Sequence, residues 1–199
     1  MSILGSLFST ALFACLLQNL IFTGAYGGDE AIRMAAKPKQ LFPLSAFIVY
    51  LSTVVSLICV LLEQSARVRA LNTYAHAAIF VGVLIVVYLI TLLFVKVVLK
   101  VKKRTVRRLG VAAFNTLVLA VPFINYRAAY GVLEAVGTGI GAGLAFVVAV
   151  LLINFGLRAI DKNEQIPKAF KGTPAIFIYV AILSLAFTGI VGQIGRAHV

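Results

Sequence analysis

The chain of 199 residues is 62% hydrophobic and carries a formal net charge of +12. Its mean hydropathy of +1.06 excludes a soluble globular protein, because a soluble domain cannot bury so much apolar surface. A membrane-spanning helix needs about 20 mainly apolar residues, and only helices and closed barrels satisfy their backbone polar groups in lipid. The apolar runs are continuous rather than alternating, so they favour helices over a barrel.

Six long apolar runs predict an all-α polytopic membrane protein with six spans. In chain order they are Ile3–Tyr26, Leu41–Leu62, Tyr74–Leu99, Leu109–Tyr126, Gly131–Ile160 and Pro174–Gly192. No loop is long enough for a soluble domain, so we expect a single membrane domain over residues 1–192, with halves of about 1–99 and 100–192. The first run lacks a basic leading segment and a clear cleavage site, so we expect it to be a retained helix.

The positive charge is distributed as a topology signal rather than as a nucleic-acid surface. The loops after the first, third and fifth spans are basic: Arg33, Lys37 and Lys39; then Lys100, Lys102, Lys103, Arg104, Arg107 and Arg108; then Arg158, Lys162, Lys168 and Lys171. The even-numbered loops carry only Arg67, Arg69 and Arg127. Basic loops remain in the cytoplasm. We therefore expect a multi-pass protein of a bacterial or archaeal cytoplasmic membrane, with lipid contacts, no nucleic-acid partner and both termini outside.

Polar residues interrupt the first span of each half. Gln18 and Asn19 precede a stretch containing Gly24, Gly27 and Gly28, and Asn115 and Thr116 precede Pro122 and Asn125. Interrupted spans at corresponding places in two halves of opposite topology predict inverted repeats whose first helices are broken near the membrane midplane. The alternative is that the asparagines only make hydrogen bonds between packed helices.

Few residues offer metal or redox chemistry. Cys15 and Cys59 stand inside apolar spans without ligand spacing, so we expect buried helix residues. His76, at a helix start, is expected to be solvated at the membrane interface. Ile194 to Val199 matches the translation of a common sequencing adapter, so we expect this segment not to belong to the native protein. We predict no catalytic residue and no metal site.

Several stretches resemble the membrane subunits of the Rnf and Nqr electron-transport complexes. They are "RRLG" from Arg107, the Asn115 region, "IPKAFKGTPAI" from Ile166 and "SLAFTGIVG" from Ser184, and Asn19 stands where the family has an Asn-Asn pair. With both termini outside, the RnfA/NqrE type is the nearer match. The resemblance implies a component of a redox-driven ion pump that works with flavin- and Fe–S-bearing subunits and with a homologous six-helix subunit. It also implies a [2Fe–2S] cluster to which each six-helix subunit contributes two cysteines.

The chain departs from the family at both cluster ligands. Counting from Asn19 places Asp29 or Gly28 at the first cysteine position, and Thr116 follows Asn115 at the second. Fe–S clusters are held by thiolates, so we expect the cluster to be lost. The competing hypothesis is a secondary transporter on the same scaffold, with Asn19, Asn115, Thr116 and Asp29 lining a midplane site. A third is an assembly or anchor subunit in which these side chains are dispensable.

Overall fold

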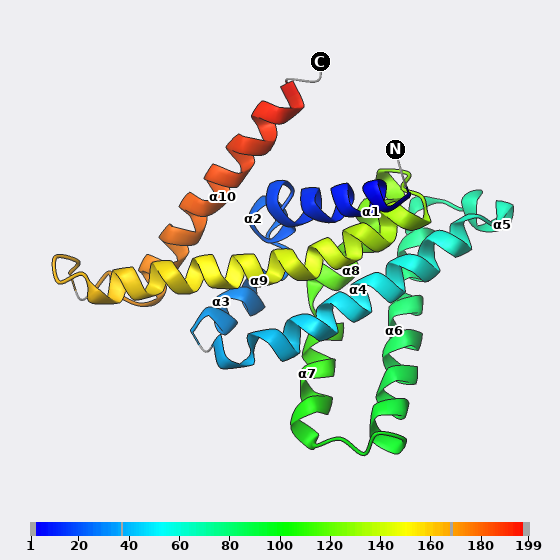
Figure 1. Cartoon of the computed structure of the whole chain (residues 1–199), viewed down its shortest axis with the longest axis horizontal. Helices are drawn as coiled ribbons and strands as arrows, with labels where there is room; N and C mark the ends of the chain where they lie inside the picture. The colour runs from blue at the N-terminus through cyan, green and yellow to red at the C-terminus, as the bar shows by residue number, and fades with distance from the viewer. Residues whose placement is uncertain (1–2, 37, 168, 197–199) are drawn as a thin grey trace.

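The computed structural model describes residues 3–36, 38–167 and 169–196, and this part of the chain is helical without strands (Figure 1). Residues 197–199, part of the segment matched to an adapter, lie outside the described residues. The helices are α1 (Ile3–Leu12), the π-helix η1 (Phe13–Leu17), α2 (Leu20–Gly24), α3 (Gly28–Ala35), the 3₁₀ turn η2 (Pro38–Gln40), α4 (Leu41–Glu63), α5 (Ala66–Arg69), α6 (Thr73–Val97), α7 (Lys103–Ala113), α8 (Thr116–Arg127), α9 (Val132–Lys162) and α10 (Thr173–Arg196).

The prediction of an all-helical membrane protein with about six spans is confirmed. Five segments of the described chain are long and apolar enough to cross a membrane: Pro38–Glu63, Thr73–Val97, Lys103–Arg127, Val132–Lys162 and Thr173–Ile190. A shorter apolar helix, Gly5–Leu17, stands at the start. The fourth span begins at Lys103 rather than at Leu109, because the basic residues before Leu109 already form helix α7.

Helices α4 and α9 pack against each other at the centre of the molecule (Figure 1). Glycines of α9 allow this close approach: a Cβ on Gly139 would lie 2.6 Å from the Cα of Thr53 on α4. On its other side, a Cβ on Gly141 would lie 2.6 Å from the carbonyl oxygen of Ala11 on α1. The glycine-rich stretch therefore packs α9 between two helices, which is how small residues act in membrane interiors.

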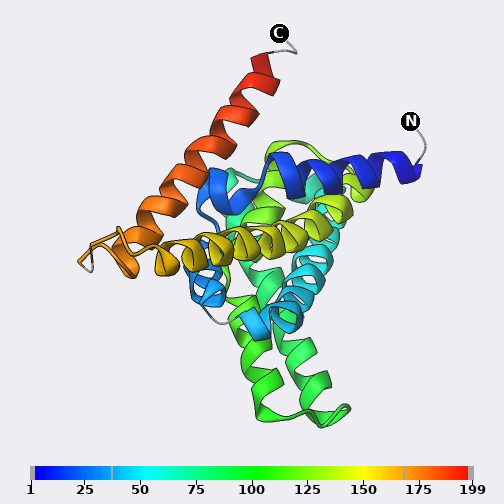
Figure 2. The ribbon, with the colours of Figure 1, turned by 60° about the vertical axis from the view of Figure 1, so that its left-hand side comes forward.

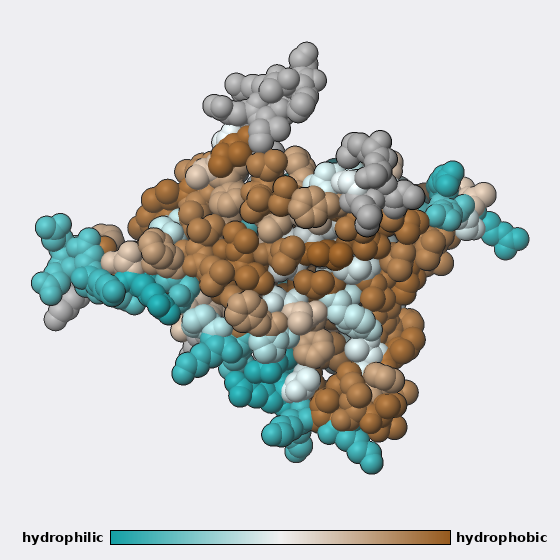
Figure 3. Space-filling view, viewed as in Figure 1, coloured by the Kyte–Doolittle hydropathy of each residue, from teal (hydrophilic) through white to brown (hydrophobic). Residues whose placement is uncertain are grey.

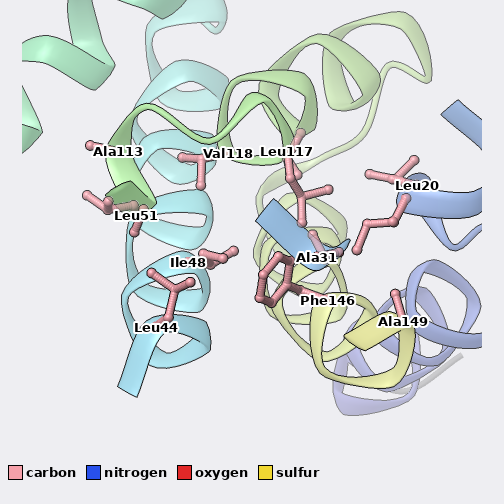
Figure 4. Packing of buried hydrophobic residues seen from close by; sticks show 14 of the residues in the cluster. Leu20, Ala31, Leu44, Ile48, Leu51, Ala113, Leu117, Val118, Phe146 and Ala149 are labelled. Atoms are coloured by element: carbon pink, nitrogen blue, oxygen red, sulfur yellow. The ribbon is translucent and has the colours of Figure 1, made fainter. Parts of the chain in front are cut away.

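The core fills the space between these helices and the two short helices α2 and α8. Figure 4 shows Ile48 of α4, Leu117 of α8, Phe146 of α9 and Leu20 of α2 converging there, and each is at most 4% exposed. Helix α3 is held against α9, since Nδ2 of Asn154 donates to the carbonyl oxygen of Ala35 over 2.6 Å. This packing fixes both ends of the segment in which the first span is interrupted.

Helix α10 extends away from the other helices in both views (Figures 1 and 2). Its main contacts are with α2 and α9, and they include a stacked Phe22–Phe187 pair at 4.8 Å and a hydrogen bond from the Tyr179 hydroxyl to the Leu152 carbonyl. Figure 3 shows a broad apolar surface, with hydrophilic surface at the turn from α9 to α10, around α3 and along lower α7. These hydrophilic areas coincide with basic segments of the chain, and a further one lies at α5.

Candidate functional site at the two broken helices

The first span is broken at the adjacent amides. The π-helix η1 ends at half-buried Gln18, whose backbone N–H donates to the carbonyl oxygen of Phe13. Asn19 then leaves the helical conformation, and its Oδ1 accepts a hydrogen bond from the backbone N–H of Ile21 over 3.2 Å. This is the N-cap arrangement that satisfies a free N–H at the start of a helix, here α2.

The amide nitrogen of Asn19 is also engaged. Nδ2 donates to the carbonyl oxygen of Ala145 on α9 over 3.2 Å and to that of Cys15 over 3.4 Å. Asn19 is fully buried. The side chain therefore caps one helix, pairs a carbonyl in the preceding turn and ties the break to α9. Asn19 thus stands at a helix break and also makes a hydrogen bond between helices.

The fourth span is broken by the same chemistry. Helix α7 ends at Ala113, Phe114 follows, and Oδ1 of Asn115 accepts from the backbone N–H of Leu117 over 2.9 Å. Asn115 is 6% exposed, but its Nδ2 is buried without a hydrogen-bond partner. Each half of the chain therefore begins with a helix broken at an asparagine, and only the first asparagine is fully satisfied.

The turn between α2 and α3 contacts the second break. The backbone N–H of Gly27 donates to Oγ1 of Thr116 over 2.8 Å, joining positions 89 residues apart in sequence. Gly27 has a φ of +74°, and a Cβ there would lie 2.5 Å from Oδ1 of Asn115. A left-handed backbone and a neighbouring side chain both require glycine at this place. The sequence analysis included Gly27 among the glycines of the interrupted first span but did not predict its contact with Thr116.

The two candidates for the first family ligand position lie just beyond Gly27. Gly28 begins α3, and a Cβ added there would meet no atom within 4 Å. Asp29 is exposed in the first turn of α3. The next residue, Glu30, is 6% exposed and accepts from Nε and Nη2 of Arg33 over 2.8 and 2.7 Å. The buried carboxylate of this segment is therefore Glu30, which sequence reasoning did not single out.

The donor groups at the junction do not fit an Fe–S cluster. Thr116 already accepts the Gly27 N–H, and the opposite side of the contact is backbone. Cys15 and Cys59 are buried and free on η1 and α4, and the described residues hold no group of three or more His, Cys, Asp or Glu that could bind a metal ion. Clusters take thiolate ligands, and none stands at either family position.

The expectation for His76 is wrong. Its ring is 1% exposed and stacks on Tyr126 with centroids 4.4 Å apart, while Nδ1 lies 3.0 Å from the carbonyl oxygen of Asn72. The side chain is covered by α8, which no local pattern in the sequence could reveal. It borders a cavity of about 320 Å³ together with Glu63 and Tyr130.

Comparison with known proteins places the chain in a family. No protein-family model matches it. It is 30% identical over 187 residues to the A subunit of the ion-translocating oxidoreductase complex of Pseudomonas paraeruginosa, an alignment covering 91% of this chain and 94% of that protein.

Two further relatives match over a shorter stretch. The chain is 38% identical over 82 residues to the A subunit of the proton-translocating ferredoxin:NAD(+) oxidoreductase complex of Clostridium ljungdahlii. It is 33% identical over 79 residues to the A subunit of the Na(+)-translocating ferredoxin:NAD(+) oxidoreductase complex of Acetobacterium woodii. In these two alignments the chain spans 42% and 41% of the relatives' length. The near full-length match with the Pseudomonas protein shows that the chain belongs to the family of A subunits of ion-translocating oxidoreductase complexes.

Proposed function

We propose that this protein is a membrane subunit of a redox-driven, ion-translocating oxidoreductase complex. The observation that carries the proposal is that the segment following the first asparagine-capped helix break contacts the second break through the Gly27–Thr116 hydrogen bond. Broken helices that face each other inside a membrane protein are typical of sites where ions or charges cross. The names of the family relatives support the same function.

The protein takes part in this function without its own half of a [2Fe–2S] cluster. The thiolates that the family resemblance implies are replaced by Gly28 or Asp29 on one side and by Thr116 on the other. The hydroxyl of Thr116 is used in closing the junction. The role of the protein is then to form part of the path through the membrane, beside the subunits that carry the electrons.

The partners are other subunits of such a complex. These partners include flavin- and Fe–S-bearing subunits and a homologous six-helix subunit. Exposed apolar side chains of α10, such as Phe177, Ile182 and Leu185, support a contact with another membrane subunit. The proposed placement is the cytoplasmic membrane with both termini outside. The basic residues of the odd-numbered loops support that orientation.

The competing function is a transporter that works alone. The observation in its favour is Nδ2 of Asn115, which is buried beside the junction without a partner and could bind a polar solute or an ion-bound water. Interior polar groups left in this state are rare and often functional. The test must therefore separate a partner-dependent activity from an autonomous one.

The experiment uses proteoliposomes and an affinity-tagged chain expressed in the organism that carries it. A redox subunit is expected to purify with flavin-containing proteins, and ion uptake is expected only when those subunits and an electron donor are present. A matched preparation of the chain alone is expected to be inactive. Uptake of sodium or protons by the chain alone would refute the redox function and favour the transporter.

A further inference from the structure

A cavity of about 420 Å³ lies at the end of the spans that carry the basic loops. It is bordered by α3, by the segment from η2 into α4, by α7 and by the first turn of α10. Figure 3 shows hydrophilic surface around α3 and lower α7, beside the apolar surface of the spans. The volume falls in the range of about 300–1,000 Å³ that ligand pockets occupy.

Three arginines and one carboxylate line this cavity. Arg33 is paired with Glu30 by two hydrogen bonds, so these two charges balance. Within the described part of the chain, no acidic group pairs with Arg107 or Arg108. Nε of Arg108 is buried without a hydrogen-bond partner. The cavity therefore has an excess of two positive charges and one guanidinium N–H that no protein group accepts.

The remaining walls are apolar. Ile32 of α3, Leu44 of α4, Val111 of α7 and Ile176 of α10 line the cavity beside the arginines. A guanidinium group pairs well with phosphate oxygens, because its planar donors match them in pairs. Basic pockets between membrane helices on the cytoplasmic side bind the head groups of anionic lipids. A soluble anion would use the charges but would leave the apolar walls without a partner.

We propose that this cavity binds the phosphate group of an anionic phospholipid, with Arg107 and Arg108 holding the phosphate and the apolar side chains contacting the start of the acyl chains. The bound lipid would contact α3, α4, α7 and α10. It would thereby connect the end of the first span to the start of the last span. The site does not involve the Gly27–Thr116 junction and does not depend on the proposed redox function.

The test measures thermal stability of the full chain in a neutral detergent. A fluorogenic thiol reagent would report unfolding, because Cys15 and Cys59 are buried and free. Phosphatidylglycerol is expected to raise the midpoint in a saturable way, whereas phosphatidylcholine and inorganic phosphate at equal concentration are not. Equal stabilisation by phosphatidylcholine would overturn the charge recognition, and equal stabilisation by inorganic phosphate would show a soluble ligand rather than a lipid.

The variants locate the site. R107Q/R108Q is expected to weaken the apparent affinity for phosphatidylglycerol at least about tenfold, since each basic contact and its hydrogen bonds are lost. The matched control is R104Q, on the same helix but exposed and outside the cavity. An equal loss in R104Q would mean diffuse attraction by the basic loop and would overturn the site.

A second variant acts in the opposite direction. E30Q removes the carboxylate that pairs with Arg33, so a third guanidinium becomes free to bind the phosphate. The expected result is tighter binding of phosphatidylglycerol by several fold. Unchanged or weaker binding by E30Q would contradict the proposal even if R107Q/R108Q failed to fold.

Discussion

Replacing Gly27 with alanine tests the contact between the α2–α3 turn and the second helix break. The alanine would have to keep a φ of +74°, which costs roughly 1–2 kcal/mol for a residue with a Cβ. Its methyl group would also stand 2.5 Å from Oδ1 of Asn115. Because that oxygen caps α8, moving it away would forfeit a cap worth about 1 kcal/mol. We therefore expect G27A to destabilise the protein by about 2–3 kcal/mol.

The neighbouring glycine provides the matched control. Gly28 begins α3, and a Cβ there would meet no atom within 4 Å. Alanine is a better helix residue than glycine, so G28A should be neutral or stabilising by up to about 1 kcal/mol. Unfolding can be followed in denaturant titrations by circular dichroism or by labelling of the two buried cysteines, because the chain contains no tryptophan.

A double variant separates the two contributions to the effect. N115A removes the side chain that the new methyl group would strike, so the loss caused by G27A should shrink to its backbone part in an N115A background. Equal stability of G27A and G28A would refute the reasoning, since the positive φ and the close contact would then have no energetic consequence. Strict additivity of G27A and N115A would refute the steric part alone.

Three further predictions use the same unfolding measurements. N19L should lower the free energy of unfolding by about 2–4 kcal/mol, because it removes a helix cap and two buried hydrogen bonds. N115L should lower it by only about 1 kcal/mol, because it removes a cap while the amide nitrogen of Asn115 has no partner to lose. Equal losses in the two variants would contradict this asymmetry. T116V should lower the free energy of unfolding by about 1 kcal/mol, because it leaves the Gly27 N–H without an acceptor. T116S keeps the hydroxyl and should retain most of the stability. A loss in T116S as large as that in T116V would show that the methyl group of Thr116 matters instead. G139A should lower the free energy of unfolding by about 1–3 kcal/mol, because the new methyl group would force α4 away from α9. G82A should be tolerated, because a Cβ there has open space around it. Equal stability of the two variants would rule out close packing at Gly139.

The overall architecture was predictable because long apolar runs have few possible structures in a membrane. The broken helices were predictable for a related reason: an amide inside an apolar run must be hydrogen-bonded, and Asn19 and Asn115 both find backbone donors at a helix start. The glycines of α9 are a comparable local signal, because small residues at helical spacing favour close helix packing. In each case the signal lies in a few neighbouring residues, so no knowledge of tertiary contacts was needed.

What could not be predicted depends on contacts between distant segments. The Gly27–Thr116 hydrogen bond joins two halves of the chain, and no local pattern pairs them. Glu30 is an acid in a helix that looks solvated, yet α3 packs against α9 and Glu30 is 6% exposed. His76 is covered by Tyr126 for the same reason. Burial of polar residues is a property of the packed helices, so the sequence of one helix does not contain it.

The two breaks have the same cap but different attachments, and this difference bears on how such a site could work. Asn19 is bonded to α9 as well as to its own helix, so any movement of the first break must also break the hydrogen bond to Ala145. Asn115 is held on one side only, and its unpaired amide would gain a partner in a different arrangement. The first break is therefore held by more hydrogen bonds than the second, a difference that the unequal losses expected for N19L and N115L would measure.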